Sequence, residues 1–165
     1  MDDESQKALM KKACLFLGRR AYSRGELRIK LSGLAGESQV ESALDRLEQL
    51  KLLNDADYAY NFALSRIRGK GWGPAKVRES LIRRHLSQAS IDRAMQQIQK
   101  EPEDESALAR YIEKYCGKKG APTQPENLHK LILHLCRRGY DRESIVQALK
   151  RIVPAAAMQH FETGE

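Results

Sequence analysis

Seven cationic side chains lie close together in the middle of the sequence, and their spacing suits binding to an anion. Residues 66–85 contain only one acid, Glu79, and carry a formal charge of +6 through Arg66, Arg68, Lys70, Lys76, Arg78, Arg83 and Arg84. Trp72, the only tryptophan, lies among them. Arginines beside an aromatic side chain on a glycine-containing loop suit a phosphate backbone or an acidic protein groove. Charge alone fits a solvated helix face with one partly buried Trp equally well.

The remaining residues that could do chemistry form no recognisable catalytic set. The loop Gly69-Lys70-Gly71-Trp72-Gly73 leads into a predicted helix and could cradle an anion. It does not follow a strand, as a dinucleotide fingerprint would, so a flexible turn between helices is the simpler interpretation. His129 and His134 are five residues apart, a spacing that does not place them on one helix face. We therefore predict that the protein is not an enzyme and has no catalytic residue, cofactor or metal site.

The composition favours a folded protein with an acidic partner. The 165 residues are 31% charged and 41% apolar, with a formal net charge of +7. No apolar run reaches the roughly 18 residues of a membrane span, and the acidic start Met1-Asp2-Asp3-Glu4 is unlike a signal peptide. Cys14, Cys116 and Cys136 lie far apart within apolar helical patterns. We predict buried thiols rather than a disulfide framework, and a cytoplasmic location.

The elements that must position the basic segment are predicted to be helices throughout. Apolar residues recur at i, i+3, i+4 and i+7, and no stretch alternates strictly. The expected helices span about 5–20, 23–34, 38–51, 55–68, 74–86, 88–99, 103–116, 125–138 and 141–152. Local signals support their boundaries: a capping box at Ser23 and Glu26, an acidic start at Asp141, prolines at first helical positions (Pro74 and Pro125) and a C-terminal cap at Gly139.

An internal repeat organises these helices. The pattern Val40-x-x-Ala43-Leu44-x-x-Leu47 returns as Ile91-x-x-Ala94-Met95-x-x-Ile98 and as Ile145-x-x-Ala148-Leu149-x-x-Ile152, at steps of 51 and 54 residues. Such a period indicates three-helix units that share a core by stacking. We predict an all-α array of three tandem three-helix repeats, 1–53, 54–101 and 102–153, followed by a tail at 154–165.

Two segments around the third repeat are predicted to be linkers. Lys100-Glu101-Pro102-Glu103-Asp104-Glu105 separates it from the second repeat, and Gly117–Thr123 is expected to be a mobile loop. Arg83-Arg84 and Arg137-Arg138 occupy equivalent places in the second and third repeats, and Arg28 and Lys30 are a looser match in the first. A stacked array would place these cations in a stripe.

Two signatures in the sequence resemble a known family. They are Tyr22-Ser23-x-x-Glu26-Leu27-x-x-x-Leu31 and Leu52-Leu53-Asn54-Asp55-x-x-Tyr58-Ala59-x-x-Phe62-x-x-x-Arg66-x-x-x-Lys70-Gly71-Trp72-Gly73-Pro74-x-x-Val77-x-x-x-Leu81. Both are similar to RecX, the regulatory protein of the bacterial recombinase RecA, and the resemblance covers about residues 8–152. Lys51 departs from the pattern, which expects a glycine before the hydrophobic pair and so leaves the geometry of this turn open.

The resemblance implies an elongated, curved array of helical repeats and a regulatory role in DNA repair, recombination and the SOS response. Members of the family bind the RecA filament on single-stranded DNA and inhibit its ATPase, strand-exchange and coprotease activities by capping or destabilising the filament. The expected partners are the RecA filament and single-stranded DNA, which is bound directly or through RecA. The protein is expected to be a monomer and to bind no membrane. The contact is expected at Arg66, Arg68, Lys70, Trp72, Lys76 and Arg78, supported by Arg83 and Arg84.

An autonomous DNA-binding protein is the alternative. Short helical trios can resemble helix-turn-helix units, and a charge of +7 favours phosphate contacts. No predicted helix carries a clear set of side chains for reading base edges, so such binding would be independent of sequence and sensitive to salt.

Overall fold

The computed structural model describes residues 2–100 and 107–152. It divides into two compact units, one formed by Met1–Phe62 with Ser80–Ala94 and the other by Ala63–Glu79 with Met95–Glu165. The predicted acidic linker at 101–105 and the predicted tail at 154–165 lie outside the described residues. Within those residues, no helix is both long and apolar enough to cross a membrane.

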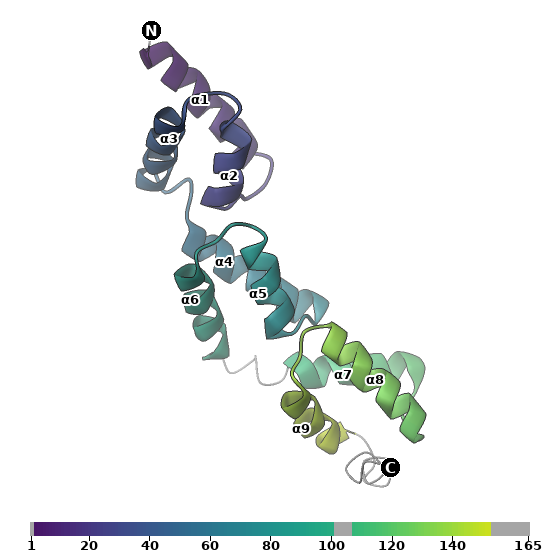
Figure 1. Ribbon diagram of the computed structural model, residues 1–165. Helices are drawn as coiled ribbons and strands as arrows, with labels where there is room; N and C mark the ends of the chain where they lie inside the picture. The colour runs from purple at the N-terminus through teal and green to yellow at the C-terminus, as the bar shows by residue number, and fades with distance from the viewer. Residues whose placement is uncertain (1, 101–106, 153–165) are drawn as a thin grey trace. The chain divides into compact units, whose positions relative to one another are not determined.

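The described residues form α-helices joined by turns and loops, without strands, which confirms the predicted all-α fold class (Figure 1). The division into repeats at 53 and 101 and the elongated, curved arrangement stay predictions. The helices are α1 (Asp2–Leu17), α2 (Arg24–Leu31), α3 (Glu37–Gln49), α4 (Asp55–Leu64), α5 (Pro74–Ile82), α6 (Gln88–Gln99), α7 (Ala107–Lys119), α8 (Pro125–Arg137) and α9 (Arg142–Ile152), and a π-helical turn, η1 (Ser65–Gly69), follows α4.

The first unit contains a core made by one face of each of α1, α2 and α3. Leu27 and Leu31 of α2 are fully buried with Leu44 and Leu47 of α3, and Leu9 of α1 is 4% exposed in the same cluster. Burying one leucine side chain contributes about 2 kcal/mol relative to exposure, so these five residues supply much of the unit's stability. The leucines of α3 recur at the helical spacing read in the sequence.

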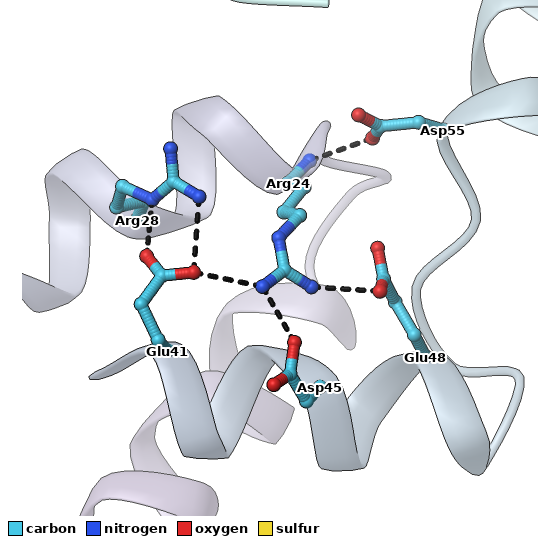
Figure 2. Close-up of polar contacts among 6 residues, drawn as sticks. All are labelled: Arg24, Arg28, Glu41, Asp45, Glu48 and Asp55. Carbon is cyan, nitrogen blue, oxygen red and sulfur yellow. Dashed lines mark hydrogen bonds and ion pairs between the residues drawn. The ribbon is translucent and has the colours of Figure 1, made fainter. Parts of the chain in front are cut away.

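Ion pairs outside this core join α2 to α3 (Figure 2). The Arg24 guanidinium binds three carboxylates of α3, those of Glu41 at 2.8 Å, Asp45 at 2.6 Å and Glu48 at 2.7 Å. These acids line one face of α3 because their spacing follows the helical turn. Arg28 also binds Glu41, and the hydrogen bonds from Arg28 and Arg24 lower the pKa of the Glu41 carboxyl.

The second unit contains a core built from α7, α8 and α9. Its fully buried members are Ile112 of α7, Leu128 and Leu135 of α8, and Ile145 and Leu149 of α9. Helices α4, α5 and α6 each contribute residues to both units. Their inward faces are also closed to solvent, at Ala59, Ala63, Val77, Leu81, Ile91 and Met95.

One structural joint occurs once in each unit. In the first unit the Ser23 hydroxyl, at the start of α2, donates to the carbonyl of Arg84 after α5. In the second unit the Gly73 N–H, at the start of α5, donates to the carbonyl of Arg138 after α8 at 2.7 Å. The residue after each arginine, His85 or Gly139, has a positive φ of 57° or 91°. The equivalent pairs Arg83-Arg84 and Arg137-Arg138 are thus each followed by a residue with the same left-handed backbone geometry.

Most predicted helix boundaries hold to within a few residues, and two differ for identifiable reasons. Helix α5 ends at Ile82 rather than near 86, because the chain turns into the left-handed conformation at His85. Helix α7 continues to Lys119, so the predicted loop is wrong for Gly117–Lys119. The last turn carries Lys118 and Lys119, which favour a helix C-terminus, and Gly120 then ends the helix at φ +85°.

The prediction of buried cysteines is wrong, because none of the three is fully buried. Cys14 and Cys136 are exposed and Cys116 is half-buried, and all three are free thiols. Cys14 is exposed although it directly follows the buried Ala13. Position within an apolar pattern does not fix burial, because neighbouring residues on a helix face different directions.

Candidate functional site

The basic segment begins in the π-helical turn that follows α4. A π-turn inserts one residue into an α-helix, and such insertions are frequent at functional sites. Here the Gly71 N–H donates to Ile67 and the Trp72 N–H to Arg66, both at 3.0 Å. Gly71 has φ +61° and is closed against the ring of Tyr111, which a Cβ at this position would overlap. Glycine is therefore required where the chain turns from Lys70 toward Trp72.

Trp72 is flanked by cations from both sides of this turn. The Arg66 guanidinium lies 5.3 Å from the ring centroid and the Lys76 ammonium 4.9 Å. Both distances are within the range of cation–π attraction. The structure thus brings three of the predicted site residues, Arg66, Trp72 and Lys76, into one group within the second unit.

We call residues 65–73, the π-turn and the loop that follows it, the basic turn. Hydrogen bonds attach this basic turn to the end of α8. The Arg138 guanidinium donates to the carbonyls of Lys70 at 2.6 Å and Gly71 at 3.3 Å. The Ala75 N–H donates to the Gly139 carbonyl at 3.1 Å. With the bond from Gly73 to Arg138, these contacts hold the turn at both ends, so its cations are displayed on a fixed backbone.

The predicted site residues differ in exposure and location. Three of them are exposed: Arg68 within the π-turn, Lys70 directly after it, and Arg83 after α5. Arg78 is half-buried on α5 and, like Arg68 and Arg83, interacts with other residues of the chain. Arg83 and Arg84 belong to the first unit, and the other six belong to the second.

The Arg84 guanidinium is committed to contacts within the first unit. It donates to the Tyr58 hydroxyl at 3.1 Å and to the Ser80 carbonyl at 3.0 Å, and it lies 4.4 Å from the centroid of Phe62. Burial and the neighbouring Glu26 carboxylate raise the pKa of the Tyr58 hydroxyl. The sequence pattern gave no signal for this commitment of Arg84, because its partners come from two helices.

Arg28 and Lys30 also contact residues of their own unit, as Arg84 does. Arg28 binds Glu41, and the Lys30 ammonium lies 5.4 Å from the Phe16 ring and 5.8 Å from the Tyr22 ring. The two residues that loosely matched the later basic pairs therefore have partners inside their own unit. The Glu41 carboxylate on α3 pairs with Arg28, whereas Arg66 and Lys76 contact the uncharged ring of Trp72.

The structure describes three of the four histidines, His85, His129 and His134. Among the described residues, no group of three or more His, Cys, Asp and Glu side chains is arranged to hold a metal ion. His134 accepts or donates a hydrogen bond at 2.9 Å with the Tyr111 hydroxyl and stacks beside Tyr111 and Tyr115. Burial, then the positive charges of Arg138, Lys119 and Arg137, lower the pKa of the His134 imidazole. His160 lies outside the described residues.

The chain is similar to proteins of one regulatory family. Residues 54–95 match the family model described as RecX, second three-helix domain. A "Regulatory protein RecX" of Prosthecochloris aestuarii is 32% identical over 155 residues, which are 93% of this chain and 99% of that protein. A protein of the same name from Pseudomonas putida is 32% identical over 143 residues, 86% of this chain and 89% of the relative.

A solved structure shares the fold. The crystal structure of RecX from Lactobacillus salivarius superposes with a TM-score of 0.79 at 16% sequence identity, covering 91% of this chain and 97% of that one. At this identity the likeness concerns the fold alone. A helical-repeat fold, a fixed basic turn and full-length similarity to regulatory proteins therefore occur together in one chain.

Proposed function

Because this chain belongs to the RecX family of regulatory proteins, we propose that it regulates the RecA recombinase by binding the RecA filament on single-stranded DNA. The observation that carries the proposal is the similarity over nearly the whole chain, since 93% of it aligns with one regulatory protein. Binding lowers the ATPase, strand-exchange and coprotease activities of RecA, through capping or destabilising of the filament. The protein acts by binding and not by catalysis.

The basic turn supplies the contact surface in this proposal. Arg66 and Arg68 come from the π-turn, Lys70 follows it directly, Lys76 and Arg78 come from α5, and Trp72 lies between them in the sequence. A filament carries DNA phosphates and acidic side chains, and both attract this charge. Preferential binding to one filament geometry would shift the filament away from its active state.

Arg83 and Arg84 have supporting roles. Arg83 is exposed and adds charge next to the end of α5. Arg84 acts mainly by positioning, because its guanidinium holds Tyr58, Phe62 and the Ser80 carbonyl together. Its carbonyl also receives the hydrogen bond from Ser23.

Charge reversal tests this surface. The variant Arg66→Glu/Arg68→Glu/Lys76→Glu is expected to bind RecA filaments at least about tenfold more weakly, because three attractive contacts become repulsive. Fluorescence anisotropy with labelled filaments measures the affinity, and the melting temperature checks folding. The matched control is Lys11→Glu/Arg93→Glu/Lys130→Glu, which reverses three exposed charges elsewhere. Wild-type inhibition of RecA by the first variant would reject the proposed surface.

Autonomous DNA binding remains the second candidate, favoured by the excess of cations in the turn. It predicts affinity for DNA without RecA that is independent of sequence and falls steeply with salt. Binding to bare oligonucleotides of several sequences, in parallel with the filament measurement, separates the two functions. Salt-sensitive binding to bare DNA of every sequence, without an effect on RecA, would support the second candidate.

A further inference from the structure

A cationic pocket lies in the second unit, next to the basic turn. It has a volume of about 560 Å³ and is bounded by the π-turn with its following loop, by α7 and by the end of α8. Five positively charged side chains line it, and no Asp or Glu among the described residues does. They are Arg68, Lys70, Arg110, Lys114 and Arg138.

The pocket is formed by residues far apart in the sequence. Arg68 and Lys70 belong to the basic segment, whereas Arg110 and Lys114 lie one turn apart on α7 and so project from the same face. Arg138 closes the third side. Helix α7 thus supplies cations that the predicted site did not include, and these cations face the predicted ones across a hollow.

The backbone around the pocket is held by specific contacts. Arg138 binds the carbonyls of Lys70 and Gly71, and its guanidinium lies 4.4 Å from the centroid of Tyr111. Gly71 lies directly against the Tyr111 ring. These contacts fix the turn relative to α7 and α8, so the hollow exists before a ligand binds and little ordering energy is needed.

Two of the five cations that line the pocket have no acidic partner among the described residues. Lys70 and Lys114 are exposed, and among the described residues neither makes an ion pair with an acid. Like charges held close together repel, and an anion among them would relieve this repulsion.

The residue types indicate phosphate as the ligand group. Arginine binds phosphate oxygens with paired N–H donors and lysine binds them as a point charge. Stacking of a base is poorly provided for, because Gly71 and Arg138 occupy the surroundings of Tyr111 and two cations flank Trp72. The volume and the five charges exceed what one phosphate needs.

We propose that this pocket binds an anion with two or more neighbouring phosphates. Two sources have this chemistry: the polyphosphate group of a free nucleotide, and successive phosphates of a single DNA strand. The proposal goes beyond the regulatory role, because it concerns an anion held by this chain itself in the absence of RecA.

Trp72 provides a direct measurement. It is the only tryptophan and lines the pocket, so its fluorescence responds to a bound ligand. Titration of the full chain with sodium tripolyphosphate or with an oligothymidylate should change this fluorescence to saturation. The variant Arg110→Gln/Lys114→Gln should lower the affinity for the ligand that occupies the pocket at least about tenfold, because it removes two charges from the pocket.

The matched control is Arg93→Gln/Lys130→Gln, which removes the same charge from exposed positions outside the pocket. It should bind like the wild type. Equal weakening by both double variants would overturn the proposal, because binding would then depend on net charge alone. The proposal would also be overturned if neither tripolyphosphate nor the oligothymidylate showed saturable binding. Melting temperatures of both variants verify that the chain is folded.

The two sources are distinguished by comparing ligands. The pocket would be assigned to free nucleotides by two results together. Tripolyphosphate and ATP would bind at micromolar concentrations and lose affinity in Arg110→Gln/Lys114→Gln, and the oligothymidylate affinity of this variant would be unchanged. The opposite pattern would assign it to a strand. Because no RecA is present, inhibition of RecA together with failed Trp72 titrations would reject the pocket proposal and leave the regulatory function intact.

Discussion

At Lys51 the backbone turns through a left-handed conformation, with φ +56°. The family pattern expects glycine at this position, and the structure retains the geometry that glycine would adopt. The Lys51 N–H donates to Glu48 and the Leu52 N–H to Leu47, both at 2.9 Å, so the turn caps the end of α3. A residue with a Cβ in this conformation carries a penalty of about 1 kcal/mol.

Replacement of Lys51 by glycine should therefore stabilise the first unit. We expect Lys51→Gly to raise the free energy of unfolding by about 0.5–1 kcal/mol, the relief of strain being partly offset by the greater freedom of unfolded glycine. Urea denaturation followed by circular dichroism measures the change. Leu50→Gly is the matched control, because Leu50 has φ −78° and should lose stability. A loss of stability in both variants would contradict the strain at Lys51.

At the scale of elements, polar contacts decide how α2 is fixed on α3. The Arg24 side chain is only 20% exposed and pairs with three acids, whereas Arg20, 49% exposed, pairs with Glu26 and lies 3.7 Å from the centroid of the Tyr22 ring. The Arg24 backbone N–H also donates to Asp55 at 2.7 Å, which extends the network to the start of α4 (Figure 2). Burial raises the pKa of the Asp55 carboxyl despite this bond.

Loss of the Arg24 side-chain charge should loosen this attachment. Arg24→Met keeps the hydrocarbon stem but leaves three acids near one another, and we expect a loss of about 1–2 kcal/mol after allowance for solvent screening. Arg20→Met should cost less, about 0.5 kcal/mol, because it removes one partly exposed ion pair and one cation–π contact with Tyr22. Thermal unfolding at low and high salt tests the contrast. Equal losses from the two variants would mean that the network adds nothing beyond ordinary surface pairs.

The sequence predicted the helices well because each has an apolar face with regular spacing. The inward positions of the repeat pattern, such as Leu44, Met95 and Leu149, are buried, except that Ala148 and Ile152 of the third copy are partly buried. The π-turn at Ser65–Gly69 was not predicted, because an inserted residue leaves no periodic signal. The end of α5 was placed too late, since His85 gives no hint that it adopts a conformation typical of glycine.

The candidate site was predicted only in part. The basic segment and Trp72 could be located from charge and composition. The contribution of Arg110 and Lys114 could not, because it depends on how α7 packs beside the π-turn. The engagement of Arg28 with Glu41 likewise depends on a partner in another helix. Charge patterns along one segment thus indicate an anion-binding region but not which cations are neutralised.

At the scale of the whole molecule, the helices form a support for a charged turn. Two buried cores and repeated backbone joints hold helices in place, and the charged turn between α4 and α5 is displayed on this support. Family membership identifies the regulatory role, and the proposal adds RecA as the target and the basic turn as the surface. The predicted consequence is inhibition of RecA by binding.

The most direct test is the single-stranded-DNA-dependent ATPase of RecA, measured with this protein added at sub-stoichiometric and then equimolar amounts. The account predicts inhibition that is lost in Arg66→Glu/Arg68→Glu/Lys76→Glu and kept in the control with three reversed charges elsewhere. Inhibition well below one molecule per RecA would point to capping of growing ends, and inhibition only near saturation to coating of the filament. An unchanged ATPase rate at every ratio would contradict the account.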